Sequence, residues 1–304
     1  MAKTRWSPSD YRNYKTTAST KTTEELFTST TLKKDMDPKG VKIRESRDSE
    51  LHPNSTAIIL GLDVTGSMGR IADNLARKGL GTLVEEILDR KPVSDPHLMI
   101  MGIGDANYDS APLQIGQFEG DIAITKWLDS LYLEHGGGGN HFESYELPYY
   151  FAAYHTSIDC FEKRNKKGFL FTLGDEMPPK NLVPAQVKKV IGDDIQPTSF
   201  KDLIAVTEKV YEPFHIIVAE GHYAQSYLEQ VKDAWMEILG QHVLVLSNWE
   251  KVSELVVSTI ELCNGVDLDT IAKSWDGDTN MVITSALKDL SISKPSTEGG
   301  VVRL

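Results

Sequence analysis

The sequence predicts an α/β fold, a doubly wound and mostly parallel sheet with helices on both faces. Continuous apolar runs, for example over 57–62, 168–174 and 214–219, are typical of strands buried on both faces of such a sheet. Segments with apolar residues at helical spacing separate the runs, which predicts strands joined by crossover helices. Two runs end directly in a carboxylate, Asp63 and Asp175. Ligands of such sheets bind beyond the carboxyl ends of the strands.

The same patterns predict the other elements of the sheet and its helices. We expect helices over 71–88, 122–133, 143–154, 224–239 and 249–262, strands over 97–104 and 242–246, and an edge strand over 114–118. This alternation defines a predicted domain over 53–265. Residues 266–304 are predicted to be a C-terminal extension with one or two helices.

Residues 1–52 differ from the rest of the chain because Ser and Thr are frequent there and apolar residues are sparse. This composition is typical of a mobile tail, so we interpret most of the segment as an N-terminal arm. The aromatic residues Trp6, Tyr11 and Tyr14 leave open a second interpretation, in which the arm docks on a neighbouring subunit or partner.

Composition limits the classes of function. The chain has 304 residues and a formal net charge of −12, with 11 Lys or Arg against 8 Asp or Glu in residues 1–50. An acidic body argues against general nucleic-acid binding. No apolar run approaches the roughly 18 residues of a membrane span. The N-terminus lacks the apolar core of a signal peptide, and two cysteines are too few for a disulfide framework, so we expect a cytoplasmic protein.

The first strand leads into three oxygen-bearing side chains spaced two apart, Asp63, Thr65 and Ser67. Gly66 and Gly69 allow a tight loop, and a helical pattern follows. Carboxylate and hydroxyl oxygens suit Mg²⁺, which takes six oxygen ligands and keeps several waters. A turn of Asp, Ser and Gly that binds nothing is the alternative. The strand placed directly before all three donors favours a Mg²⁺ or Mn²⁺ site.

The segment Asp63-Val64-Thr65-Gly66-Ser67-Met68 resembles the metal-ion-dependent adhesion site of von Willebrand factor A (VWA) domains, whose signature is Asp-x-Ser-x-Ser. Thr65 replaces the first Ser and keeps the hydroxyl. The resemblance implies two further ligands, a Thr after Gly-Gly and an Asp at the end of a later strand. Asn140 of Gly138-Gly139-Asn140 and Asp175 of Leu173-Gly174-Asp175 take these positions.

Both of these matches are looser than the first motif. Glu143 or Ser144 could supply the loop oxygen in place of Asn140, which also suits a turn beside glycines. Asp175 could instead stabilise a turn or cap a helix. Asp105, which follows another predicted strand, is expected at most to support the site without ligating the metal.

The resemblance implies a protein-recognition module rather than an enzyme. Neutral hydroxyls leave the cation incompletely neutralised, so a partner's Asp or Glu would complete its coordination. Cytoplasmic VWA proteins of bacterial or phage type often act as adaptors of MoxR-type AAA+ ATPases, which are therefore the expected partner. A structural component of a virion or other assembly is the alternative, and the arm would then serve oligomer formation.

A serine hydrolase is a more remote alternative. Thr65-Gly66-Ser67-Met68-Gly69 is similar to a nucleophile elbow, and His135-Gly136-Gly137-Gly138 is similar to an esterase oxyanion loop. The elbow normally has Gly where Thr65 stands, the His-Gly-Gly-Gly segment normally precedes the nucleophile, and Asp63 has no role in this chemistry. We therefore expect no enzyme activity.

Overall fold

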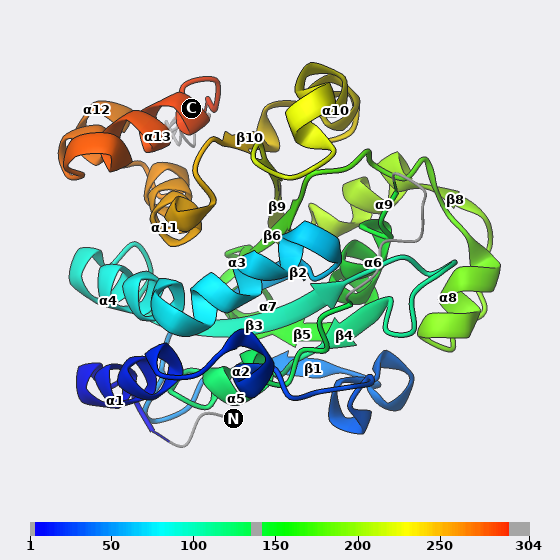
Figure 1. Ribbon diagram of the computed structural model, residues 1–304, viewed down its shortest axis with the longest axis horizontal. Coiled ribbons are helices and arrows are strands. Elements are labelled where there is room, and N and C mark those ends of the chain that lie inside the picture. The colour runs from blue at the N-terminus through cyan, green and yellow to red at the C-terminus, as the bar shows by residue number, and fades with distance from the viewer. Residues whose placement is uncertain (1–3, 135–141, 292–304) are drawn as a thin grey trace, which may run out of the picture.

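The computed structural model describes residues 4–134 and 142–291 of the chain (Figure 1). Its centre is a six-stranded sheet in the order β10-β9-β6-β2-β3-β4. The strands span Ser55–Asp63 (β2), Asp95–Ile103 (β3), Leu113–Ile115 (β4), Gly168–Gly174 (β6), Tyr211–Val218 (β9) and Val243–Leu246 (β10). Neighbours pair in parallel except β3 and the edge strand β4. The prediction of a doubly wound, mostly parallel α/β fold is confirmed.

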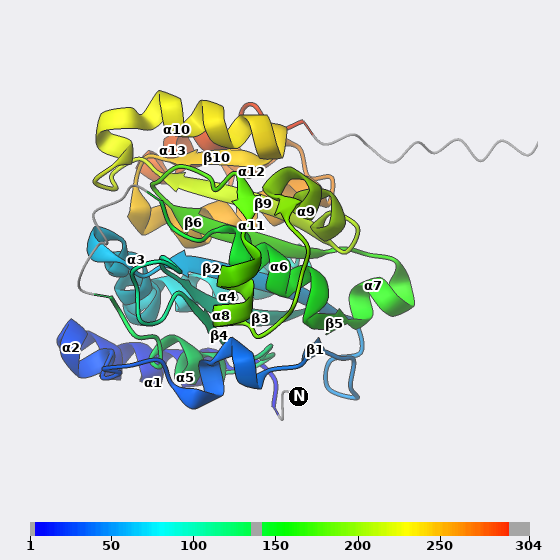
Figure 2. The same cartoon turned by 90° about the vertical axis from the view of Figure 1, so that its right-hand side faces the viewer.

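Helices cover both faces of the sheet (Figures 1 and 2). One face carries α1 (Pro8–Ser19), α2 (Thr23–Leu26), α3 (Gly69–Asn74), α4 (Leu80–Arg90), α5 (Ile124–Leu128), α11 (Val252–Cys263), α12 (Leu268–Lys273) and α13 (Gly277–Leu287). The other carries α6 (Glu146–Tyr154), α7 (Asp159–Arg164), α8 (Pro184–Val190), α9 (Phe200–Thr207) and α10 (Ala224–Leu239).

Strand β2 lies at the centre of both hydrophobic cores because its side chains alternate between the faces. Ile58, Leu60 and Leu62 pack into the core beneath α3, α4 and α11, whereas Ala57 and Ile59 pack into the core beneath α6, α9 and α10. All five are buried. This two-sided burial explains why the segment is continuously apolar.

Several elements differ in extent from the sequence-based expectation. Helix α5 is shorter than the predicted helix over 122–133, since its chain turns away after Leu128. Helices α7, α8 and α9 were not predicted, because each is short. Two small strand pairs were also not predicted, β1 (Arg44–Ser46) with β5 (Thr156–Ile158) and β7 (Asn181–Leu182) with β8 (Thr198–Ser199).

The N-terminal segment packs against the body of its own chain, so the interpretation of a mobile tail is wrong for the described residues of 1–52. Trp6, Tyr11, Phe27 and Met36 are buried in the same core as β2. The indole N–H of Trp6 donates to the carbonyl of Pro96, 3.2 Å away. In both ribbon views α1 and α2 lie beside α5. The few apolar side chains of the segment suffice because the sheet supplies a surface to cover.

The C-terminal helices also join the body, since Ile271, Ile283 and Leu287 of α12 and α13 are buried in the core beneath α11. No helix among the described residues is long and apolar enough to cross a membrane. The chain passes from β2 to β3 and β4 on one side and then returns through β6 on the other side of β2. The strand order therefore changes direction between the adjacent strands β2 and β6, and ligands of such sheets bind beyond the carboxyl ends of the strands at this place, the carboxyl edge.

Candidate metal centre

Asp63 ends β2 and lies almost completely buried at this carboxyl edge of the sheet. Its Oδ1 accepts hydrogen bonds from the backbone N–H of Thr65 at 2.9 Å and from the Thr65 hydroxyl at 2.7 Å. The same hydroxyl oxygen lies 3.2 Å from Oε1 of Glu143. Thr65 has one hydroxyl hydrogen for two carboxyl groups, so either a proton on one of these groups or a cation must compensate their charge.

Glu143 and Glu176 bring two further carboxyl groups to the carboxyl edge, because a parallel bridge joins Phe142 to Met177. Oε2 of each glutamate is buried and has no hydrogen-bond partner among the described residues. Burial, followed by repulsion from Asp63, raises the pKa of Glu176 to about 8. The same two causes, in the same order, raise the pKa of Glu143 well above its usual range. A cation at this place would relieve both effects.

Tyr145 fixes the other oxygen of Asp63. Its hydroxyl donates to Asp63 Oδ2 at 3.0 Å, and its ring packs against His215 and Trp235 with ring centroids 5.1 and 5.5 Å away. Gly174 makes room for this hydroxyl, since a Cβ there would lie 1.8 Å from Tyr145 Oη. The carboxylate of Asp63 is therefore held in one orientation by rigid neighbours.

Asp175 follows β6 directly, as predicted, but its carboxylate has a hydrogen-bonding role of its own. Oδ2 accepts from the backbone N–H of Tyr223 at 2.8 Å, just before α10. Gly221 leaves room for the carboxylate, because a Cβ there would lie 2.3 Å from the Cβ of Asp175. Burial raises the pKa of Asp175. This geometry supports the turn-stabilising alternative. Asp175 still lies near Asp63, and the charge of Asp175 helps to raise the pKa of Asp63.

The remaining predicted residues fall in different places. Asn140 lies outside the described residues, as does the side chain of Ser67, whose backbone forms a 3-10 turn over Gly66–Met68. Ser144 turns towards the β3 end of the sheet, where its hydroxyl accepts from the backbone N–H of Ala106 at 2.9 Å. Of the two alternatives to Asn140, only Glu143 contacts Thr65. Asp105 accepts hydrogen bonds from Asn107 and is a neighbour of the centre.

The residues present fit a hard cation bound by carboxylate and hydroxyl oxygens. Asp63, Thr65 and Glu143 supply such donors at one point, and the unpartnered oxygens of Glu143 and Glu176 offer more. Among the described residues, no group of three or more His, Cys, Asp or Glu side chains is arranged to hold a metal by itself.

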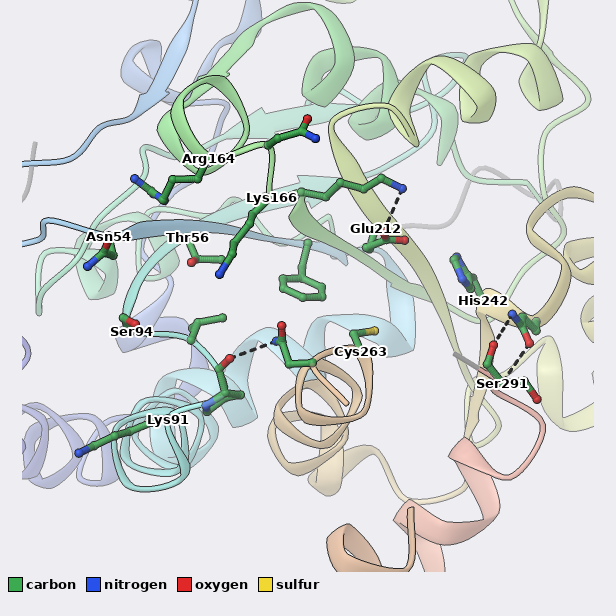
Figure 3. A pocket seen from close by; sticks show the side chains of 17 residues that line it. Asn54, Thr56, Lys91, Ser94, Arg164, Lys166, Glu212, His242, Cys263 and Ser291 are labelled. Atoms are coloured by element: carbon green, nitrogen blue, oxygen red, sulfur yellow. Dashed lines mark hydrogen bonds and ion pairs between the residues drawn. The ribbon is translucent and has the colours of Figure 1, made fainter. Parts of the chain in front are cut away.

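A larger cavity of about 910 Å³ lies at the opposite edge of the sheet, where Thr56, Lys166, Glu212 and His242 surround it (Figure 3). Its lining is richer in Lys and Arg than in acids, and two of these basic side chains already form ion pairs. Arg164 pairs with Asp48 and Lys167 with Glu212. Helices α4, α7 and α11 end beside the cavity, and basic side chains stabilise such helix C-termini. We therefore assign the functional site to the carboxyl edge.

Neither Tyr145 nor Glu176 was predicted as a site residue from the sequence, and Glu143 was predicted only as an alternative to Asn140. Gly174 was a usable signal, because a glycine at the end of a buried strand indicates a close approach by another group. The adjacent carboxylates Asp175 and Glu176 were another. The position of Tyr145 depends on how the chain returns to the sheet, which no local pattern specifies.

No protein-family model matches the chain, and no curated protein is similar to it in sequence. Among solved structures, the pilus adhesin SpaC from Lactobacillus rhamnosus GG in its open conformation is 12% identical over 77% of this chain, with a TM-score of 0.44. A second crystal structure of that adhesin is also 12% identical, over 73% of the chain, with a TM-score of 0.43. The matches cover 31% and 32% of the adhesin chains, so this chain spans under a third of their length.

Proposed function

We propose that this protein is a divalent-cation-dependent recognition module, in which Mg²⁺ or Mn²⁺ at the carboxyl edge of the sheet binds an Asp or Glu of a protein partner. The observation that carries the proposal is the shared hydroxyl of Thr65, which lies 2.7 Å from Asp63 Oδ1 and 3.2 Å from Glu143 Oε1. Without a cation, one of these two buried carboxyl groups must hold a proton, and the raised pKa of Glu143 is consistent with this, whereas a cation coordinated by the same oxygens compensates both carboxylates.

The ligands that we propose are Asp63, Thr65 and Glu143 together with Ser67. Asn140 stays a proposal from the resemblance alone. Asp175 is proposed to act through a bound water, because Tyr223 already donates to its carboxylate. Hydroxyls and waters leave the cation with residual positive charge, so a carboxylate from outside binds it well.

The partner proposed from the VWA resemblance is a MoxR-type AAA+ ATPase in the cytoplasm, for which this protein would act as an adaptor. In this proposal the cation holds a partner's side chain, so the site serves recognition rather than catalysis. The arm packs on its own chain in the structure.

Calorimetric titration of Mg²⁺ into chelator-treated protein tests the metal site. We expect one site in the wild type, a loss of binding of about tenfold or more in Asp63→Asn and Glu143→Gln, and no change in Glu229→Gln, which alters an exposed carboxylate of α10. Equal binding in the wild type and in both site variants would contradict the proposal.

Recognition of a carboxylate needs a second measurement. N-acetyl-aspartate N-methylamide reproduces a partner's Asp side chain, and its binding is followed by amide chemical shifts in two-dimensional NMR. We expect shifts near Thr65 in the Mg²⁺-loaded protein that disappear with chelator. Shifts that persist with chelator would show that the carboxylate does not bind through the ion.

A further inference from the structure

A hollow of about 310 Å³ lies beside the candidate metal centre. Its lining includes the acidic residues Glu143, Glu146 and Asp105. Phe142 and Val183, two exposed apolar residues, line it as well and are taken as its rim. We propose that this hollow receives a Lys or Arg side chain of the partner whose carboxylate binds the metal. The identity of the partner rests on the proposed function, whereas cation binding in the hollow can be measured separately.

Unpartnered carboxylate oxygens are the first observation. Glu146 begins α6 and is 2% exposed, and its Oε2 has no hydrogen-bond partner among the described residues. Oε2 of Glu143 is likewise buried and has no hydrogen-bond partner among the described residues. Such oxygens are costly when buried without a donor, so a charged N–H donor that reaches them is strongly favoured.

The charge of the surrounding face is the second observation. Seven carboxyl groups are close enough to one another to influence their charges, namely Asp63, Asp105, Asp109, Glu143, Glu146, Asp175 and Glu176. Burial raises the pKa values of Glu143, Glu146 and Glu176, so these groups hold protons until a cation displaces them. A partner's carboxylate alone finds only acceptor oxygens on this face, whereas a basic side chain beside that carboxylate donates to them.

The shape of the hollow selects a long basic side chain. Phe142 is 51% exposed and Val183 is 40% exposed, so the rim offers apolar contact to the methylene groups of Lys or Arg. The charged head then faces the carboxyl groups of Glu143 and Glu146. Lys180 also lines the hollow and is exposed, so it competes weakly with an incoming cation.

The test uses n-propylguanidinium, which reproduces the Arg side chain, and N-propylurea, its neutral counterpart. Each is titrated into the full-length, Mg²⁺-loaded protein while the amide signals of Asn181 and Val183 are followed by NMR. We expect saturable shifts with the cation and much smaller shifts with the urea. Glu146→Gln should weaken the binding of n-propylguanidinium by about tenfold or more. Lys180→Ala should strengthen the binding of n-propylguanidinium, and the exposed control Glu229→Gln should leave that binding unchanged.

Equal binding of the two probes, or unchanged cation binding in Glu146→Gln, would overturn the inference. If Glu146→Gln does not fold, Asn181→Lys replaces it, because this exposed position at the hollow accepts a positive charge without disturbing the core. A Mg²⁺ titration of the same samples separates the two proposals. If Mg²⁺ binds and n-propylguanidinium does not, only the inference about the hollow is contradicted. If n-propylguanidinium binds and Mg²⁺ does not, only the metal-centred function is contradicted.

Discussion

The hydroxyl of Tyr145 lies 3.0 Å from Oδ2 of Asp63, in space that exists because residue 174 is a glycine. Tyr145 is fully buried against Trp235 and His215, so it has no room to move aside. Gly174→Ala should therefore lower the free energy of unfolding by about 3 kcal/mol, through steric conflict at a packed site.

Urea denaturation of Gly174→Ala, compared with Gly40→Ala, checks this prediction. A Cβ at Gly40 would meet nothing within 4 Å, so that substitution should change stability by less than about 0.5 kcal/mol. Equal effects of the two substitutions would mean that Tyr145 does not depend on the glycine.

The packing of the N-terminal segment predicts that it stabilises the body. Trp6→Ala removes a buried indole and its hydrogen bond to Pro96, and should cost about 3 kcal/mol in the free energy of unfolding. Lys15→Ala, an exposed change on α1, should cost little. An unaltered denaturation midpoint in Trp6→Ala, with rapid proteolysis to a fragment that starts near residue 50, would restore the interpretation of a separable tail.

The comparison of sequence and structure shows which features are local. The central strands were predictable because burial on both faces forces continuous apolar runs, as in β2 and β6. The docking of Trp6 and Met36 was not, because their burial depends on a surface formed by distant parts of the chain. A Ser- and Thr-rich segment with few apolar residues has the same local pattern whether it docks or not.

The residues of the candidate site also include some that a local sequence pattern predicts and others that depend on distant parts of the chain. Asp63 and Thr65 belong to one short motif, so the sequence placed them together correctly. Glu143 and Glu176 meet through the bridge between Phe142 and Met177, a long-range pairing without a local signal. Asp175 was predicted at the strand end, but its hydrogen bond to Tyr223 could be found only from the structure.

Glu143 is predicted to serve binding at the expense of stability. In the metal-free protein its carboxyl group is buried near Asp63 and Glu176, both of which raise its pKa after burial itself. Glu143→Gln keeps the size and removes the charge, so the metal-free variant should be at least as stable as the wild type. Thermal unfolding with chelator measures this, and a clearly lower melting temperature in the variant would contradict it.

His97 predicts a dependence of stability on pH. Burial, followed by the neighbouring His52, lowers the pKa of His97 to about 4, while Asp95 and Asp48 act in the opposite direction. Its Nδ1 lies 3.1 Å from the Ser46 hydroxyl. Because the unfolded state binds a proton near pH 6.5, stability is full above that pH and falls as the pH decreases towards 4.

Lowering the pH from 7 to 5 should reduce the free energy of unfolding by about 2 kcal/mol through His97. Denaturant titrations of the wild type and His97→Asn at both pH values isolate the contribution, since other groups titrate alike in both proteins. The loss of stability at pH 5 should be about 2 kcal/mol smaller in the variant. The same loss in both proteins would show that His97 remains free to take up a proton in the folded state.

We propose that a divalent cation binds between Asp63, Thr65 and Glu143. The most direct test is an anomalous difference map from crystals grown with Mn²⁺, because the metal then marks its own position. We predict a single strong peak within coordination distance of the Asp63 carboxylate, the Thr65 hydroxyl and Glu143. A map without a peak at this edge of the sheet, from protein at saturating Mn²⁺, would contradict the claim.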